Sequence, residues 1–133
     1  MNLKASGWIG VAIVAALCAG WLWGASGRSA TEQQRRQLEE RLDFSEAHAA
    51  LADGRVSLYL VNFGDANRHF DDALRVVQRV QTRLREVGQP ERAGRLEVVL
   101  AQVREAQRLS AALDQGAQSA ADQALQALRS VEK

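Results

Sequence analysis

The strongest pattern in the chain is an apolar position that recurs at alternating steps of three and four residues. Spacing of this kind places side chains on one side of an α-helix, as at the a and d positions of a coiled coil, whereas a β-strand needs alternation at every second residue. Of the positions that form this pattern, Ser45 is the one that breaks it with a polar side chain. The positions are Leu38, Leu42, Ser45, Ala49, Ala52, Val56, Tyr59, Phe63, Ala66, Phe70, Ala73, Val77, Val80, Leu84 and Val87. The pattern predicts helices that bury this stripe in a core.

The segment Val56 to Phe63 is apolar nearly all round the helix. Leu58, Leu60 and Val61 lie off the stripe, so the pattern predicts burial on several sides here, at the centre of the core.

The sequence Asn62-Phe63-Gly64-Asp65 allows two interpretations. Glycine can adopt the left-handed conformation that ends a helix, and aspartate can cap the next one. However, the stripe passes through Gly64 without a change of register. We favour a turn, because a glycine inside a helix costs about 1 kcal/mol relative to alanine. The alternative is one helix from Thr31 to Val87.

Later breaks are clearer. Gly88 can end one helix and Pro90 can begin the next, where its missing N–H group costs nothing. Asp114-Gln115-Gly116 predicts another turn. The fold class is therefore all-α, with an antiparallel helical bundle or coiled-coil-like domain of three to four helices at 28–133. We expect helices at about 31–62, 65–87, 90–114 and 117–131.

An uncharged segment covers residues 5–25 and holds Trp8, Trp21 and Trp23 near its ends. As a helix it is about 31 Å long, which matches the hydrocarbon core of a bilayer, and tryptophan is common at membrane interfaces. We predict an uncleaved signal-anchor at 1–27 that contacts membrane lipid through residues 5–25, followed by a hinge at 24–29. A cleaved signal peptide is the main alternative, and a lipoprotein signal at Cys18 fits less well because leucine precedes the cysteine.

The flanking charges leave the orientation of this anchor open. Lys4 precedes the segment and Arg28, Arg35 and Arg36 follow it, whereas a short basic tail before an apolar run is typical of export signals. We expect an inner-membrane protein with its soluble domain in the periplasm. Small residues at every fourth position also predict a homodimer through the anchor. They are Ala12, Ala16, Gly20 and Gly24.

The composition of the chain argues against some classes of function. With 17 basic and 16 acidic residues the net charge is +1, and no aromatic residues interleave with the arginines, so we expect no nucleic-acid partner. Cys18 is the single cysteine, which excludes a disulfide within one chain. The basic residues are nearly all arginine, a usage associated with GC-rich genomes.

Candidate chemistry is sparse. His48 and His69 have Asp43, Glu46, Asp71 and Asp72 near them in sequence, but the Glu-x-x-His spacing of helical metal sites is missing. The sequence therefore predicts no catalytic, cofactor-binding or metal residue, no cofactor and no enzyme activity. Arg75, Arg79 and Arg83 predict a solvated outer face.

These observations predict a membrane-anchored scaffold or adaptor of a bacterial cell envelope that binds an unidentified protein partner. The alternative from another class is a periplasmic metal-binding or stress-protective helical bundle.

Overall fold

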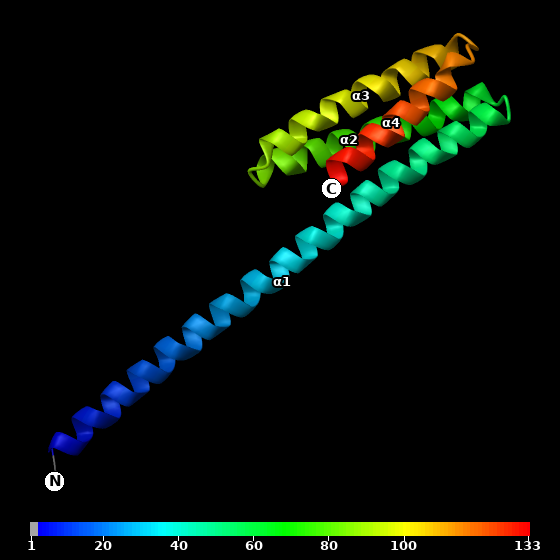
Figure 1. The fold of residues 1–133 in the computed structure, drawn as a ribbon. Coiled ribbons are helices and arrows are strands. Elements are labelled where there is room, and N and C mark those ends of the chain that lie inside the picture. The colour runs from blue at the N-terminus through cyan, green and yellow to red at the C-terminus, as the bar shows by residue number, and fades with distance from the viewer. Residues whose placement is uncertain (1–2) are drawn as a thin grey trace. The chain divides into compact units, whose positions relative to one another are not determined.

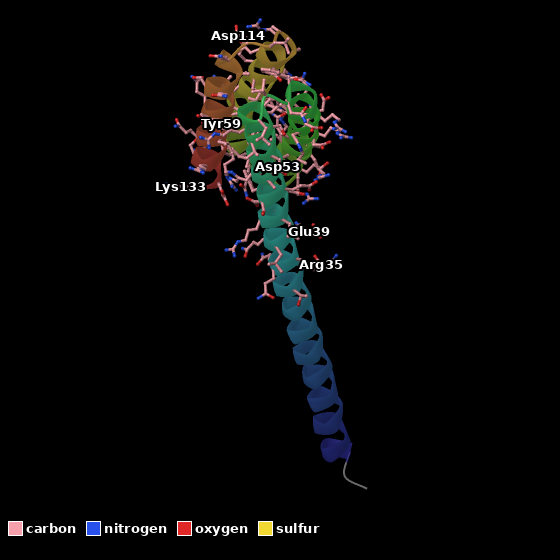
Figure 2. All side chains as sticks on the ribbon, turned by 90° about the vertical axis from the view of Figure 1, so that its right-hand side faces the viewer. Arg35, Glu39, Asp53, Tyr59, Asp114 and Lys133 are labelled. Carbon is pink, nitrogen blue, oxygen red and sulfur yellow. The ribbon has the colours of Figure 1, made fainter. Side chains whose placement is uncertain are left out.

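The computed structural model describes the backbone of residues 3–133 and the side chains of residues 31–133, which Figure 2 draws as sticks. The described chain is helical, with no strand between residues 3 and 133. Its elements are α1 (Leu3–Tyr59), α2 (Phe63–Glu86), α3 (Pro90–Ala111) and α4 (Gly116–Glu132). The predicted all-α class and the helical bundle are confirmed.

The chain divides into two units, the first ending at Glu39 and the second comprising Glu40–Lys133. The second unit is the bundle, in which α2, α3 and α4 follow the end of α1 as successive antiparallel helices joined by short turns (Figure 1). All contacts described below lie within this unit.

The helical backbone of α1 passes through residues 24–29 without the predicted hinge and through Thr31 without the predicted start. Glycine and serine lower helix propensity by about 1 kcal/mol or less each, and no proline is present to interrupt the backbone. The side chains of the predicted anchor at residues 5–25 lie outside the described residues. Within the part of the chain whose side chains the structure describes, no helix is long and apolar enough to cross a membrane.

The three turns of the bundle share one geometry. In each, the second residue after the last helical residue has positive φ: Val61 at 57°, Gly88 at 76° and Leu113 at 56°. The N–H of the following residue donates to a carbonyl five residues earlier, as from Asn62 to Ser57 at 2.8 Å. Gln89 to Leu84 and Asp114 to Leu109 repeat this bond at 2.8 and 2.9 Å. These are Schellman motifs, which satisfy the last carbonyl groups of a helix.

The turn favoured near Gly64 is confirmed, but its position differs. The left-handed residue is Val61, and Gly64 lies in the first turn of α2. The cap of α2 is Asn62 instead of Asp65: its side-chain Oδ1 accepts a hydrogen bond from the Asp65 N–H at 3.2 Å. Gly88 ends α2 and Pro90 begins α3 as predicted.

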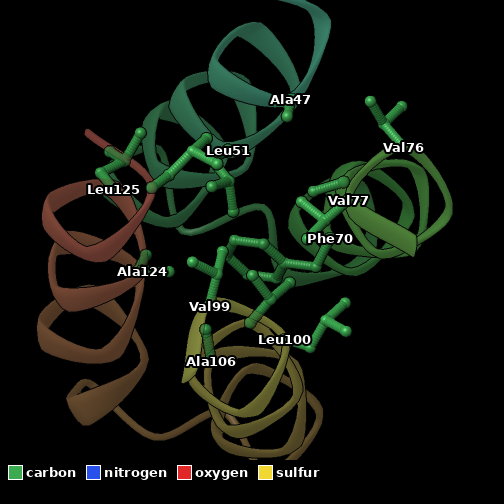
Figure 3. Close-up of a cluster of buried hydrophobic side chains, with 14 of the residues drawn as sticks. Ala47, Leu51, Phe70, Val76, Val77, Val99, Leu100, Ala106, Ala124 and Leu125 are labelled. Atoms are coloured by element: carbon green, nitrogen blue, oxygen red, sulfur yellow. The ribbon is translucent and has the colours of Figure 1, made fainter. Parts of the chain in front are cut away.

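The core of the bundle receives side chains from all four helices. Phe70 of α2 points into the middle of the cluster, where Leu51 of α1 and Val99 of α3 also point (Figure 3). Most of the apolar positions predicted for α2 are buried, and α3 and α4 each bury an apolar face as well. The fully buried large ones include Phe70, Val77, Leu84, Leu96, Val99, Val103, Leu128 and Val131.

The buried face of α1 is not the predicted one. Phe44, Ala47, Leu51 and Leu58 enter the core, and they also follow three- and four-residue steps. The predicted stripe lies on the opposite side of the helix, where its large members Leu38, Leu42, Val56 and Tyr59 are exposed. The core takes the set with Phe44, Leu51 and Leu58 because these side chains bury more apolar area than the serine and alanines in the middle of the stripe.

Ion pairs hold α1 against its neighbours in the bundle. Arg83 Nη1 of α2 lies 2.6 Å from Asp43 Oδ2, and Arg79 Nε lies 3.4 Å from the other oxygen of the same carboxylate. Arg79 also reaches Glu46 at 2.5 Å. Two of the three arginines predicted on an outer face therefore bind α1, and Arg75 pairs with Asp72 on its own helix.

Candidate interaction surface

The end of the bundle that carries the α1–α2 and α3–α4 turns exposes three large apolar side chains. Leu60 is 74% exposed, Val61 71% and Leu113 66%. We call these three residues the apolar tip. The sequence predicted burial for Leu60 and Val61, and both predictions were wrong. The reason is that each side chain belongs to a turn that reverses the chain outside the core.

Two residues of the apolar tip hold a conformation that their side chains disfavour. Val61 and Leu113 have φ near 57°, in the left-handed region, which costs a residue with a Cβ about 1 to 2 kcal/mol. A β-branched residue such as valine is an outlier there. Glycine is the usual residue at this position of a Schellman motif, and the same chain places Gly88 there in its α2–α3 turn.

The α2–α3 turn, with Gly88 at its left-handed position, can be compared with the two turns at the tip end. All three turns have the same hydrogen bonds, yet only the two at the tip end use large apolar residues at the left-handed position. Strained backbone of this kind persists where surrounding structure holds it, and it gathers at binding and active sites.

The two turns at the tip end are in contact. The hydroxyl of Ser110, on α3, donates to the backbone carbonyl of Phe63, on α2, at 3.3 Å. Beside this contact lies a hollow of about 250 Å³. It is lined by Leu58, Tyr59, Val61, Phe63, Asp114, Gln115 and Gln118. The tip therefore combines protruding apolar side chains with a concave, partly polar floor.

Further polar contacts fix this end of the bundle. The Asp114 carboxylate accepts a hydrogen bond from the Gly116 N–H at 2.7 Å, at the start of α4. Arg55 of α1 lies over the Tyr59 ring at 5.4 Å from its centre and pairs with Asp122 of α4 at 2.6 Å. These contacts hold the turns in place, so the apolar tip is presented on a fixed frame.

The two histidines of the sequence lie in different places. His48 Nε2 is 3.3 Å from a carboxylate oxygen of Glu132 on α4. His69 lines an open groove of about 570 Å³ between α1 and α2, together with Glu46, Asp53 and Asp72. Among residues 31–133, no three histidine, cysteine, aspartate or glutamate residues are arranged to hold a metal ion.

One carboxylate on the bundle surface has a perturbed pKa. Hydrogen bonds from the Arg108 guanidinium, at 2.6 and 2.8 Å, lower the pKa of Glu105, and the same contact raises the pKa of Arg108. Both residues belong to α3 and stand three positions apart, so this is an ordinary pair on one helix and not a reactive group.

Comparison of the chain with protein-family models, with curated proteins and with solved structures finds no match.

The sequence held a signal for the apolar tip that the periodicity obscured. At both turns a large apolar residue directly precedes a good capping or turn residue, in Val61-Asn62 and Leu113-Asp114, with no glycine at the helix end. A left-handed residue must follow a helix that ends in a Schellman motif. Where glycine is missing, the neighbouring apolar side chain takes that place and is turned outward.

Proposed function

We propose that the protein is a membrane-anchored adaptor of a bacterial cell envelope that binds another protein through its apolar tip. The observation that supports this most is the use of Val61 and Leu113 where glycine would relieve strain. Exposed apolar residues at two adjoining turns offer a partner the anchoring contacts that dominate protein–protein interfaces.

The chemistry of the tip favours a protein partner over a small molecule. Its side chains protrude into solvent, whereas small-molecule sites are concave and bury most of their ligand. Carboxamide and carboxylate groups from Asp114, Gln115 and Gln118 border the hollow, and such polar groups typically form the rim of an interface.

The proposal includes attachment to the inner membrane. Residues 5–25 supply the spanning segment, and the bundle at 40–133 lies in the periplasm. A reporter enzyme that is active only outside the cytoplasm, fused after Lys133, would then be active. Activity of a cytoplasmic reporter alone at the same position would reverse the orientation.

Site-specific photocrosslinking in cells tests the partner site. A benzoylphenylalanine residue placed at Leu60 or Leu113 in the full chain is expected to capture the same protein. Gln78, exposed on α2 away from the tip, is the matched control position. Equal capture from Gln78 and from the tip would contradict the proposal.

A stabilised variant separates binding from folding. Replacing Val61 and Leu113 together by glycine removes the apolar side chains while relieving backbone strain. We expect capture from Leu60 to be lost although the protein melts at a higher temperature than the parent. Unchanged capture would exclude these two side chains from the interface.

The alternative function, a metal-binding or stress-protective bundle, has its own test. Isothermal titration of the full chain with Zn²⁺, Cu²⁺ or Ni²⁺ should give no micromolar binding if the adaptor proposal holds. Micromolar binding that is lost on His48→Ala or His69→Ala would favour the alternative.

A further inference from the structure

The face of α1 opposite the core carries a stripe within the bundle unit that is apolar at every position except Ser45. Leu42 is 68% exposed, Val56 54% and Tyr59 57%, and two exposed alanines lie between them. We call this surface the α1 stripe, and it consists of Leu42, Ser45, Ala49, Ala52, Val56 and Tyr59. Their spacing is that of the a and d positions of a coiled coil.

Charges flank the α1 stripe in a regular order. The positions just before each a residue, called g, hold two arginines and a histidine. They are Arg41, His48 and Arg55. The positions just after each d residue, called e, are acidic along the same length, at Glu46 and Asp53. One flank of the stripe thus carries nitrogen side chains that can donate hydrogen bonds, and the other carries carboxylates that accept them.

We propose that a second copy of this chain packs on the α1 stripe as a parallel, in-register coiled coil. In a parallel pair each g residue faces the e residue five positions later on the other helix. Arg41 then faces Glu46 of the second copy, and His48 faces Asp53. In an antiparallel pair g faces g and e faces e, which would set basic against basic and acidic against acidic.

The contacts within one copy leave the four side chains of the two proposed pairs available for contacts between copies. Among the described residues, Arg41 and Asp53 take part in no ion pair, so each proposed pair has one such member. Glu46 pairs with Arg79 and His48 with Glu132, but the side chains of Glu46 and Glu132 are at least half exposed. Exposed pairs exchange at little cost. Arg55 is already held by Asp122, and the e position that it would face is the apolar Leu60.

The middle of the α1 stripe suits close approach of two helices. Ala49 and Ala52 have small side chains, so two backbones can come near each other there, while Leu42, Val56 and Tyr59 supply larger contacts towards the ends. Because the core face and the α1 stripe are on opposite sides of α1, each bundle can stay folded while the two copies pair.

Cysteine crosslinking measures the pairing and its direction. In the full chain with Cys18→Ser, purified in mild detergent, Leu42→Cys is expected to form a disulfide-linked dimer on gentle oxidation. Ser119→Cys, exposed on α4, is the control and should give only background. If Leu42→Cys links no more than Ser119→Cys, the proposal is wrong.

A mixture of two cysteine variants tests whether the paired helices run parallel or antiparallel. Leu42→Cys mixed with a size-tagged Val56→Cys chain should give little of the mixed dimer, because residues 42 and 56 are two heptads apart in a parallel pair. An antiparallel pair centred near Ala49 would bring them together, so efficient mixed linkage would overturn the parallel arrangement.

Charge reversal at Arg41 and Glu46 tests whether these two flanking residues pair across the dimer. Arg41→Glu alone and Glu46→Arg alone each set two like-charged pairs in the homodimer, and we expect the dimer Kd of each to rise about tenfold. Mixing the two variants makes both pairs attractive again, so the mixed dimer should regain the parent Kd. Circular dichroism melts check that each variant is folded.

Dimers that are unaffected by either single change, or that fail to recover in the mixture, would contradict the charge pairing. The outcome does not depend on the apolar tip, because none of these substitutions alters Leu60, Val61 or Leu113.

Discussion

Gly54 of α1 lies against the ring of Phe70 of α2 so closely that a Cβ atom at position 54 would be 2.7 Å from Phe70 Cε1. The absence of a side chain at Gly54 thus lets α1 approach the centre of the core. It also explains why a residue with poor helix propensity stands in the middle of a buried helical face.

Gly54→Ala is therefore expected to destabilise the bundle by about 1 to 3 kcal/mol, since the aromatic ring is enclosed and cannot move aside cheaply. Gly94→Ala is the matched control, because a Cβ at Gly94 would meet nothing within 4 Å. That change should stabilise α3 by about 0.5 to 1 kcal/mol through backbone entropy. Urea unfolding followed by circular dichroism measures both, and equal effects would refute the close approach.

Val61→Gly is expected to stabilise the protein by about 1 kcal/mol, because it removes the left-handed strain without removing a core contact. Leu113→Gly should act in the same direction. The reverse change at the third turn, Gly88→Val, should destabilise by a similar amount although its side chain would have open space. A lower midpoint of urea unfolding for Val61→Gly would contradict this account of the turns.

Phe70→Ala is expected to destabilise the bundle by about 3 to 5 kcal/mol, which is a large share of the 5 to 15 kcal/mol typical of a folded domain. Val77→Asp should have a comparable or larger effect, because it puts a charge into the same core. Val98→Asp is the control, since Val98 is exposed on α3. Thermal melts that match the parent within a degree or two would remove Phe70 and Val77 from the core.

Asp43→Asn is expected to destabilise by about 1 to 3 kcal/mol, because the largely buried carboxylate accepts a hydrogen bond from Arg83 and lies near Arg79. Asp72→Asn, which affects an exposed pair with Arg75, should change stability by under about 1 kcal/mol. The two variants can be compared by urea unfolding. Similar values would mean that Asp43 does not fasten α1 to α2.

The sequence predicts the helices of the bundle well because their ends carry residues with strong local preferences. Gly88 and Pro90 fix the α2–α3 turn by backbone geometry alone. In α2, α3 and α4 one apolar face dominates, so periodicity identifies the buried side.

Periodicity fails on α1 because this helix has two apolar faces with the same spacing. Phe44 and Leu51 lie on one face, and Leu42 and Val56 lie on the other. Because both faces have the same repeat length, the repeat does not indicate which face is buried in the core. The choice depends on the volume available next to Phe70, which is a property of the assembled core. The positions of Val61 and Leu113 were missed for a related reason: the pattern counts apolar residues but does not indicate where a turn directs them.

The two faces of α1 also restrict how this segment can change in length. A helix advances about 100° per residue, so deleting Ala50 would rotate the residues before it by that angle relative to the residues after it. Phe44 and Ala47 would leave the core, and Leu42 would no longer lie in line with Val56. A change of seven residues, close to two full turns, keeps both faces aligned. Variants of this chain that still fold should therefore differ between Arg41 and Tyr59 by substitution or by whole heptads.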